Sequence, residues 1–300
     1  MTTKVQHRIN YCRIAEEEEL DLSNCELTHL PDLSELTHVV YLSLENNQIS
    51  DLSSLLALTH LKGLKLANNQ ITDIQSLSNL VNLEVLYVGR NQISDLSPLS
   101  SLTQLQHLYI GGNLISDLRP LSRLYNLKSL YAKRNKINDL RPLSRLMNLT
   151  ELYLWDNQIE NIRPLSCLYN LHTLFLRGNQ ISDISALTTL NRLGHLDICC
   201  NNIEDISPIV PMLKRQLRVL YKKNYSGNCV AVAGNPLAPS VIEAIKAGNE
   251  AVIDHYAQFP SNKPKKIVPI VPIHLPSLPV YQHRLRVVRP QAAPFLLKSM

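Results

Sequence analysis

The sequence has few large aromatic residues other than tyrosine. Its 300 residues include three Phe and one Trp, against twelve Tyr. Tyrosine combines an apolar ring with a polar hydroxyl and is common at binding surfaces. Aliphatic residues, with leucine the commonest, must therefore supply most of the core. We expect the aromatic residues to serve the surface more than the interior.

Motifs that mark several large enzyme classes are missing. The sequence contains no GxSxG nucleophile elbow, no HExxH zinc motif and no GxxxxGK[ST] phosphate loop. Paired carboxylates suited to acid–base catalysis are also missing from any one predicted element. We therefore expect a protein that is not an enzyme and that holds no cofactor and no metal.

The cysteines and the apolar segments bear on location. The six cysteines form no CxxC pair and no regular disulfide framework, which is typical of a reducing compartment. The first 20 residues lack the apolar core of a signal peptide, and no apolar run of about 18 residues occurs. We expect a cytoplasmic protein without a membrane partner.

The positive charge is concentrated near the C-terminus. Residues 261–300 hold seven Lys or Arg and no acidic residue, which leaves 30 − 7 = 23 basic against 25 acidic residues in 1–260. The body is thus slightly acidic, which argues against nucleic acid as a partner. The tail is also rich in proline, so we expect residues 261–300 to be disordered.

A 22-residue unit, LxxLxLxxNxIxxLxxLxxLxx, repeats along the chain. Its xxLxL part alternates as a strand does, and the apolar residues at every third position favour a 3₁₀-like return. The asparagine is expected to turn inward and bond backbone groups, with Cys25 as its substitute in the first turn. No single turn buries its leucines alone, so the turns must stack. The column begins at Cys25 and continues as Asn47, Asn69, Asn91, Asn113, Asn135, Asn157, Asn179 and Asn201.

This unit resembles the leucine-rich repeat family, in its short 22-residue class with an aspartate after the isoleucine and a Pro-Leu pair. The resemblance covers about residues 17–213 and includes Asp95 with Pro98 and Asp117 with Pro120. It implies an α/β solenoid, a right-handed curved horseshoe with a parallel concave sheet and a 3₁₀ or irregular convex side. Similar repeats occur in internalins, in the leucine-rich regulatory subunit of protein phosphatase 1 and in bacterial Roco proteins.

The two ends help to choose among these relatives. The opening HRINYCRIAEEEELDLSNCELTHLP resembles the start of Roco leucine-rich domains, and AGNPLAPSVIEAIKAGNEAVIDHYAQF resembles the segment that leads to their GTPase. Internalins would bring a signal peptide and an immunoglobulin-like domain, which we do not find. The missing phosphate loop means that no nucleotide chemistry is carried over from Roco proteins.

The expected organisation follows from these ends. After Asn201 the next turn is CVAVAGNPL with Asn235, 34 residues later, so about 12 residues are inserted. SVIEAIKAGNEAVIDHYAQF has a helical period and predicts a closing helix or helix pair, capped at Ser240. We expect a helical cap over 1–16, nine regular turns and an irregular last one over 17–235, a helical cap over 236–260 and the tail.

Residues on the concave sheet face form the candidate site. The two leucines of each LxL point inward, so the residue between them faces out, and in five consecutive turns it is aromatic. Trp155, which follows Leu154, faces out as well, and the same patch has a hollow of small residues at Gly89, Gly111 and Gly112. We expect this surface to bind a protein partner through Tyr87, Arg90, Tyr109, Tyr131, Lys133, Arg134, Tyr153, Trp155, Phe175 and Arg177.

Two alternatives to this interpretation stay open. The aromatic column fits a ladder that only stabilises a parallel sheet. The chain also fits an architectural remnant of a Roco-type regulatory domain, acting through dimerisation or in trans on a GTPase. Pairing of two copies is therefore a second partner hypothesis.

Two further groups of residues are weaker candidates for a binding site. Arg119, Arg141 and Arg163 form a basic column on the convex side that suits an acidic partner, but aspartates nearby favour cross-turn ion pairs. His195 and Cys199 alternate with Asp197 on the concave face. A straight strand keeps them about 13 Å apart from end to end, too far to converge on one metal ion.

Overall fold

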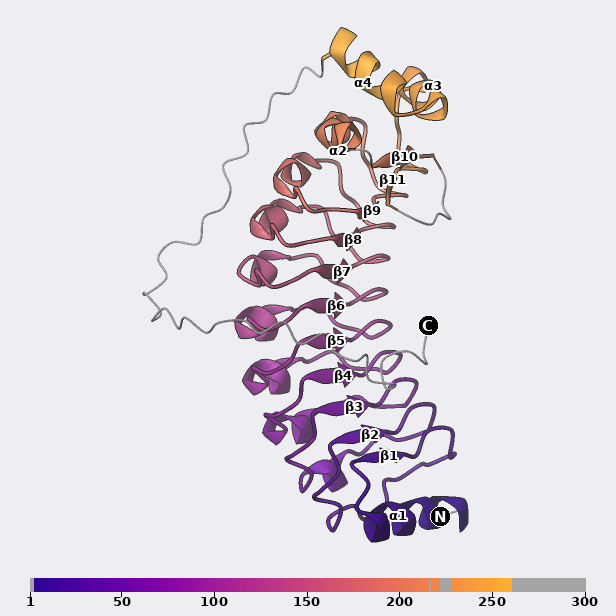
Figure 1. Cartoon of the computed structure of the whole chain (residues 1–300), viewed down its shortest axis with the longest axis vertical. Coiled ribbons are helices and arrows are strands. Elements are labelled where there is room, and N and C mark those ends of the chain that lie inside the picture. Colours follow the sequence, from indigo (N-terminus) through magenta and orange to yellow (C-terminus); the bar gives the residue numbers. More distant parts are fainter. Residues whose placement is uncertain (1–2, 216, 222–227, 261–300) are drawn as a thin grey trace, which may run out of the picture.

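The computed structural model describes residues 3–215, 217–221 and 228–260, which form one elongated, gently curved stack of turns (Figure 1). Eleven short strands make one parallel sheet along the inner side of the curve, and 3₁₀ helices line the outer side. This arrangement confirms the predicted open solenoid with a parallel sheet. Residues 261–300, for which disorder is predicted, lie outside the described residues.

Each strand of the sheet is three residues long, and β1 to β9 begin at the position before the first leucine of their LxL. Neighbouring strands pair in parallel with a register of one repeat, so that Leu86 aligns with Leu108 and Tyr87 with Tyr109. Side chains from the same repeat position therefore form columns across the sheet. The strands are β1 (Glu19–Asp21), β2 (Tyr41–Ser43), β3 (Gly63–Lys65), β4 (Val85–Tyr87), β5 (His107–Tyr109), β6 (Ser129–Tyr131), β7 (Glu151–Tyr153), β8 (Thr173–Phe175), β9 (His195–Asp197), β10 (Arg218–Leu220) and β11 (Cys229–Ala231).

Helices close both ends of the stack, and short 3₁₀ helices return the chain on the convex side. The α-helices are α1 (Thr3–Ala15), α2 (Val210–Lys214), α3 (Pro239–Ala247) and α4 (Asn249–Gln258). The 3₁₀ helices are η1 (Ser53–Leu55), η2 (Gln75–Asn79), η3 (Ser97–Ser101), η4 (Arg119–Arg123), η5 (Arg141–Leu143), η6 (Arg163–Cys167), η7 (Ser185–Thr189) and η8 (Ser207–Ile209).

The repeated asparagine bonds one turn to the next. Asn135 Oδ1 accepts from the Ile115 N–H at 3.0 Å, and its Nδ2 donates to the carbonyls of Ile110 at 3.0 Å and Ala132 at 3.2 Å. Buried backbone groups at the bend are thus paired. Leaving one of them without its hydrogen bond would lower stability. Cys25 is buried in the same column, as predicted, and its N–H donates to Asn47 Oδ1 at 3.1 Å.

Leucine and isoleucine fill the interior of the stack. Nearly all the repeat leucines are fully buried, including Leu86, Leu108 and Leu130. Burying each one is worth about 1.5–3 kcal/mol, and each contacts only its own and adjacent turns. The ends need covering for the same reason. Val5 of α1 and Val252 of α4 are both 0% exposed.

The C-terminal end departs from the regular repeat. β11 follows β9 in the sheet, and Asn235 takes the ladder position at the predicted place, with its Oδ1 accepting from the Ile203 N–H at 3.2 Å. The inserted segment adds β10 beyond β11, so the strand order ends β9-β11-β10. The sequence reasoning predicted the insertion but not its strand.

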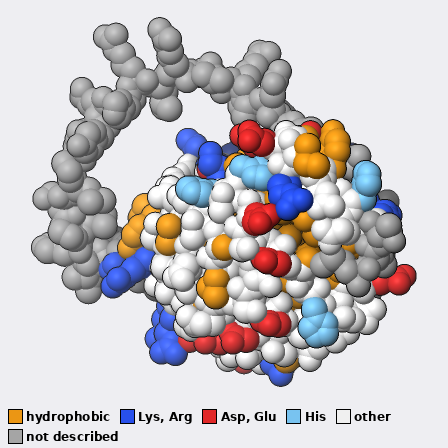
Figure 2. Space-filling model, turned by 90° about the horizontal axis from the view of Figure 1, so that it is seen from below, with side chains coloured by type: hydrophobic (Ala, Val, Ile, Leu, Met, Phe, Trp, Pro, Cys, Tyr) orange, Lys and Arg blue, Asp and Glu red, His pale blue; other side chains and the backbone are white. Residues whose placement is uncertain are grey.

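Side chains close the two outer edges of the sheet. At β10 the Val219 N–H donates to Asn249 Oδ1 at 3.0 Å, and Asn249 Nδ2 donates to the Leu217 carbonyl at 2.6 Å. At β1 a guanidinium N–H of Arg8 donates to the Asp21 carbonyl at 2.8 Å. These bonds occupy backbone groups that could otherwise pair with another strand. Figure 2, viewed from the α1 end, shows charged side chains of both signs there.

The closing segment is a helix pair broken at Gly248. That residue has φ of 116°, a conformation that side-chain-bearing residues avoid. The prediction that Ser240 caps the first helix is wrong, because α3 begins one residue earlier, at Pro239, with Ala238 as its N-cap and no side-chain cap bond. Proline is suited to the first helical position because it lacks an N–H there and has a preset φ.

Candidate partner-binding surface

Four tyrosines of the concave face stack on one another across β4 to β7. The ring centroids of Tyr87 and Tyr109 lie 3.9 Å apart, those of Tyr109 and Tyr131 4.2 Å, and those of Tyr131 and Tyr153 4.1 Å. The planes are within 14° of parallel. Neighbouring rings therefore cover each other's faces, and a partner reaches mainly ring edges and hydroxyls.

Tyr87, at the start of this tyrosine ladder, differs from its prediction. The sequence places it on the outward side of its strand, but it is only 8% exposed. Tyr109 covers one face of the ring, and Lys65 Nζ lies 5.5 Å from its centroid. Burial raises the pKa of the Tyr87 hydroxyl, with a further contribution from its hydrogen bond to Tyr109. Its ring is thus part of the packing, and the half-buried Tyr109, Tyr131 and Tyr153 carry the accessible part of the ladder.

A second column on the same face was missed by the sequence reasoning. Because strand side chains alternate, the residue two places before each tyrosine also faces the concave side. In this column Glu151 Oε2 accepts a hydrogen bond of 2.7 Å from the Tyr131 hydroxyl, and His107 Nδ1 lies 3.2 Å from Ser129 Oγ. Burial and then the bond to Glu151 raise the pKa of Tyr131, so its hydroxyl stays protonated.

The ring arrangement changes at β7 and β8. Phe175 lies 4.9 Å from Tyr153 at an interplanar angle of 74°, so it does not extend the parallel ladder. Trp155 lies 5.8 Å from Phe175 at 22° and 6.1 Å from Tyr153 at 88°. Phe175 and Trp155 are both half-buried. The only tryptophan thus begins a differently oriented aromatic group on the open face.

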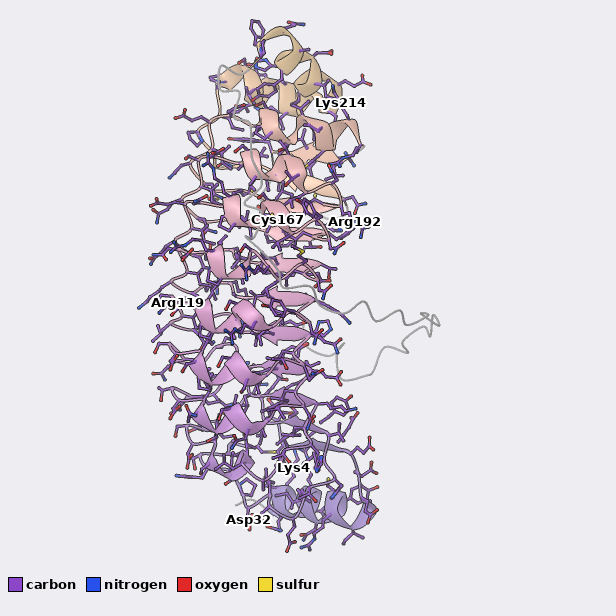
Figure 3. All side chains as sticks on the ribbon, turned by 90° about the vertical axis from the view of Figure 1, so that its left-hand side faces the viewer. Lys4, Asp32, Arg119, Cys167, Arg192 and Lys214 are labelled. Carbon is purple, nitrogen blue, oxygen red and sulfur yellow. The ribbon has the colours of Figure 1, made fainter. Side chains whose placement is uncertain are left out.

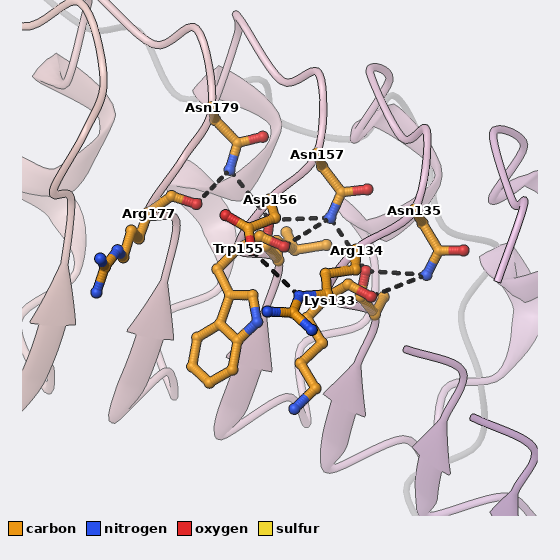
Figure 4. A network of polar contacts seen from close by, with 10 residues as sticks. Lys133, Arg134, Asn135, Trp155, Asp156, Asn157, Arg177 and Asn179 are labelled. Carbon is orange, nitrogen blue, oxygen red and sulfur yellow. Dashed lines mark hydrogen bonds and ion pairs between the residues drawn. The ribbon is translucent and has the colours of Figure 1, made fainter. Parts of the chain in front are cut away.

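Lys133 joins this tryptophan to the basic residues (Figure 4). Its Nζ lies 5.0 Å from the Trp155 ring centroid, within cation–π range. Desolvation, followed by the positive charges of Arg90 and Arg134, lowers the pKa of Lys133. One acid offsets this charge, since Arg134 Nε lies 3.5 Å from Asp156 Oδ2.

The predicted hollow of small residues is largely filled. A Cβ built on Gly111 would come within 2.8 Å of Lys133 Cγ, so the lysine stem lies directly over this glycine. A Cβ on Gly89 would meet the Gly111 carbonyl oxygen at 3.0 Å. The glycines therefore permit close approach of Lys133 and of neighbouring backbones, and the expected hollow is not open at Gly111.

Two of the predicted arginines lie at the rim, past the strands. Arg90 and Arg134 have φ of 53° and 52° in the tight turn that follows each strand. The same position holds Gly112, Asn68 and Asp156, residue types that tolerate a left-handed conformation. That composition is the sequence signal for this turn. The ladder, the aromatic pair and the rim arginines lie on adjacent turns of one face.

The weaker candidate groups do not form sites. Arg119 and Arg141 pair with aspartates of their own turn, at 2.7 and 2.9 Å, because each aspartate lies two residues before its arginine. Only Arg163 makes the expected cross-turn pair, at 3.7 Å from Asp183. Asp197 and Cys199 are buried. In the described part of the chain no three metal-binding side chains gather.

The stack of identical turns joined by an asparagine ladder defines a repeat protein whose curved sheet is open on one side. A family model described as leucine-rich repeats, in two copies, matches six overlapping stretches from residues 59–101 to 169–211. Together these span 211 − 58 = 153 of the 300 residues. The chain belongs to the leucine-rich repeat proteins.

Several solved structures of this class are similar to this chain. An internalin (inlF) from Listeria monocytogenes is 26% identical with a TM-score of 0.57, over 83% of this chain and 87% of the internalin. Internalin C2 of the same species is 26% identical with a TM-score of 0.51, over 79% and 93%. A leucine-rich repeat protein of Leptospira interrogans, 19% identical with a TM-score of 0.53 over 74% of both chains, shares the fold.

No curated protein sequence matches the chain. None of the three structures named above is a Roco protein, so the resemblance of the caps stays a prediction. Over the described residues no helix has the length and apolar character needed to cross a membrane.

Proposed function

We propose that this chain is a non-enzymatic interaction module that binds a protein partner through its concave face. Leucine-rich repeat proteins generally mediate protein–protein interaction. The observation that carries the proposal is the group of Arg90, Lys133, Arg134 and Trp155, here called the Trp155 cluster, in which Lys133 lies over the Trp155 ring and the two arginines act on the lysine charge. Desolvation, followed by the positive charges of Arg90 and Arg134, opposes the charge of Lys133, and repeat packing does not require such a cluster, since other turns lack it.

A partner with carboxylates would relieve that repulsion. Arg134 has an acidic neighbour, Asp156, and the guanidinium of the exposed Arg90 donates to the Asn68 amide oxygen at 3.4 Å. Tryptophan and arginine dominate binding hot spots, and a stable interface needs about 800 Å² on each side. The Trp155 cluster would supply the anchors, with Tyr131, Tyr153, Phe175 and Arg177 around them.

The rigidity of the face favours binding. The tyrosine ladder fixes ring positions, and the Tyr131 hydroxyl is held by Glu151. Side chains that are ordered before binding lose little conformational entropy when a partner arrives. The same surface on a flexible support would bind more weakly.

Affinity capture with the full chain tests the proposal. The double variant Lys133→Glu, Trp155→Ala should lose a partner that the wild-type chain retains, because it reverses one charge and removes the ring. Arg119→Glu, an exposed change on the convex side, is the matched control and should retain the partner. Each variant is first shown to unfold at the wild-type temperature. Equal capture by all three would contradict concave binding.

A second candidate function is architectural. The face-to-face tyrosine stacking supports it, because the ring faces pack against one another and are not accessible to a partner. In that case the chain is a remnant of a Roco-type regulatory domain that dimerises or acts in trans on a GTPase. Tyr109→Ala should then lower the melting temperature clearly, and the Trp155 cluster variants should leave all binding unchanged.

We also propose a reducing, cytoplasmic location. None of the six cysteines, all of which lie among the described residues, forms a disulfide in the structure, and five of them are buried. Alkylation of the denatured protein taken directly from cells should modify every thiol. A mass shift short of six alkyl groups, restored by prior reduction, would contradict a reducing compartment.

A further inference from the structure

Three exposed apolar residues follow one another on the flank of the stack. Tyr125, Met147 and Tyr169 are 50%, 40% and 48% exposed and occupy the same position in consecutive turns. Each lies between the 3₁₀ helix of its turn and the next strand, away from the concave tyrosine ladder. Single exposed apolar residues are ordinary, but an aligned row of large ones forms a patch. We call these three residues the flank stripe.

The backbone of the flank stripe is held on both sides. The Tyr125 N–H donates to the Arg123 carbonyl at 2.9 Å, and the Tyr125 carbonyl accepts from Asn148 Nδ2 at 2.8 Å. Met147 repeats both bonds, with Arg145 at 2.9 Å and Asn170 Nδ2 at 2.8 Å. These asparagines form a second ladder along the flank. The exposed side chains therefore project from an ordered support.

The repeat itself does not need apolar residues at this position. Thr103 and Asn191 occupy it in other turns, with the same N–H bond to the residue two places before, at 2.9 and 3.0 Å. The local geometry is thus kept by polar side chains. Tyr125, Met147 and Tyr169 are consequently not explained by packing of the fold.

The flank stripe lies in basic surroundings. Arg123 and Arg145 precede two of its members by two residues, and Lys128 follows. Among the residues that the structure describes, none of these three cations forms an ion pair. The segments 122–128, 144–150 and 166–172 contain no acidic residue. Figure 3 labels Cys167 and Arg192 at the C-terminal end of this region, across the convex side from Arg119.

We propose that the flank stripe binds an acidic amphipathic helix of a protein partner. Successive turns lie about 5 Å apart, close to the helical pitch of about 5.4 Å. A helix laid along the flank would place apolar residues spaced by three and four on successive turns. Carboxylates beside that apolar face would meet Arg123, Arg145 and Lys128.

The positive charge of the flank argues against two other occupants, a second copy of the chain and the tail. A second copy of the chain would bring the same acid-free basic segments against themselves, with like charges facing each other. The tail over residues 261–300 holds seven Lys or Arg and no acidic residue, so it has the sign of the flank. Both would be repelled where an acidic helix is attracted.

The test uses two synthetic helical peptides of about 14 residues, long enough for three to four turns. Both carry leucine on one face, and they differ only in having glutamate or lysine beside it. The full chain should bind the glutamate peptide and not the lysine peptide. Two double variants test the site. One combines Tyr125→Ser with Tyr169→Ser, and the other combines Arg123→Glu with Arg145→Glu. Each should weaken binding by about tenfold or more.

The Lys133→Glu, Trp155→Ala variant of the concave face should bind the glutamate peptide as the wild type does. All these changes are exposed or half-buried, and each variant is compared by melting temperature to show that it folds. Absence of glutamate-peptide binding, equal binding of the lysine peptide, or loss only in the concave variant would each overturn the proposal. Because the concave variant serves as the control, the flank and concave proposals fail separately.

Discussion

The Tyr131 hydroxyl donates a hydrogen bond of 2.7 Å to Glu151, which lies on the next strand of the sheet. This bond ties the tyrosine ladder to the polar column beside it. Both residues are half-buried. Tyr131→Phe keeps the stacked ring and removes only the donor, so stability should fall by about 0.5–1.5 kcal/mol.

Chemical denaturation measures that change. Tyr125→Phe, at an exposed position outside the ladder, gives the comparison for loss of a tyrosine hydroxyl. A double variant with Glu151→Gln should show that the two effects are not additive, as expected for directly bonded residues. Additive effects would mean that the bond contributes nothing of its own.

The asparagine ladder makes a larger prediction. Asn157 Oδ1 accepts from the Ile137 N–H at 3.1 Å, and its Nδ2 donates to the carbonyls of Ala132 at 3.0 Å and Leu154 at 2.9 Å. Asn157→Ala leaves buried backbone groups unpaired, each costing about 1–3 kcal/mol. We expect a loss of about 3 kcal/mol or more in urea unfolding. Exposed Asn138→Ala should cost little, and a similar loss in both would contradict the ladder's role.

The pH dependence of stability should show the half-buried His107. Burial, helped by the charge of Lys128, lowers the pKa of His107, so the folded state favours neutral imidazole. The unfolded chain titrates near about 6.5. This contribution to stability is therefore complete above about pH 6.5 and is lost as pH falls from there through the lowered folded pKa.

His107→Gln cannot gain that proton. Its melting temperature should consequently fall less than that of the wild type between about pH 7 and pH 5. Calorimetry at several pH values measures the two slopes, with His60→Gln at an exposed position as the comparison. Identical slopes for the wild type and His107→Gln would show that burial does not lower the pKa of His107.

The closed edge of β10 predicts an aggregation phenotype. Asn249 occupies the outward Val219 N–H and the Leu217 carbonyl, which are otherwise free to add another strand. Asn249→Ala should make the chain self-associate at rising concentration in sedimentation or light scattering. Exposed Glu250→Ala next to it should not. A variant that stays at the wild-type size would show that the helices alone protect the edge.

Much of the fold could be predicted because the repeat length never changes between Cys25 and Asn201. A constant period fixes the register, so the column that holds Tyr109 and the column that holds Asn135 both follow from counting. The β10 strand could not be predicted, because its segment has no repeat partner. The N-cap of α3 was misplaced by two residues, at Ser240 instead of Ala238, because the proline at 239 was passed over as the first helical residue.

The candidate site was predicted in position but less well in exposure. Counting places Tyr87 on the concave face, yet ring stacking buries it, and stacking depends on side-chain rotamers that a period does not specify. Glu151 was missed although strand alternation places it beside the ladder. Tyr125 and Tyr169 lie outside the strands, where exposure depends on the path of the chain between elements.

We propose that a protein partner binds the concave face at Trp155. The most direct measurement replaces Trp155 with photo-reactive benzoylphenylalanine in the full chain and illuminates living cells, with the same replacement at Arg141 on the convex side as the comparison. Concave recognition predicts a specific covalent adduct from position 155 that is absent from position 141 and is lost when Lys133→Glu is added. Adducts from position 141 alone, or none from position 155 in a correctly folded chain, would contradict the claim.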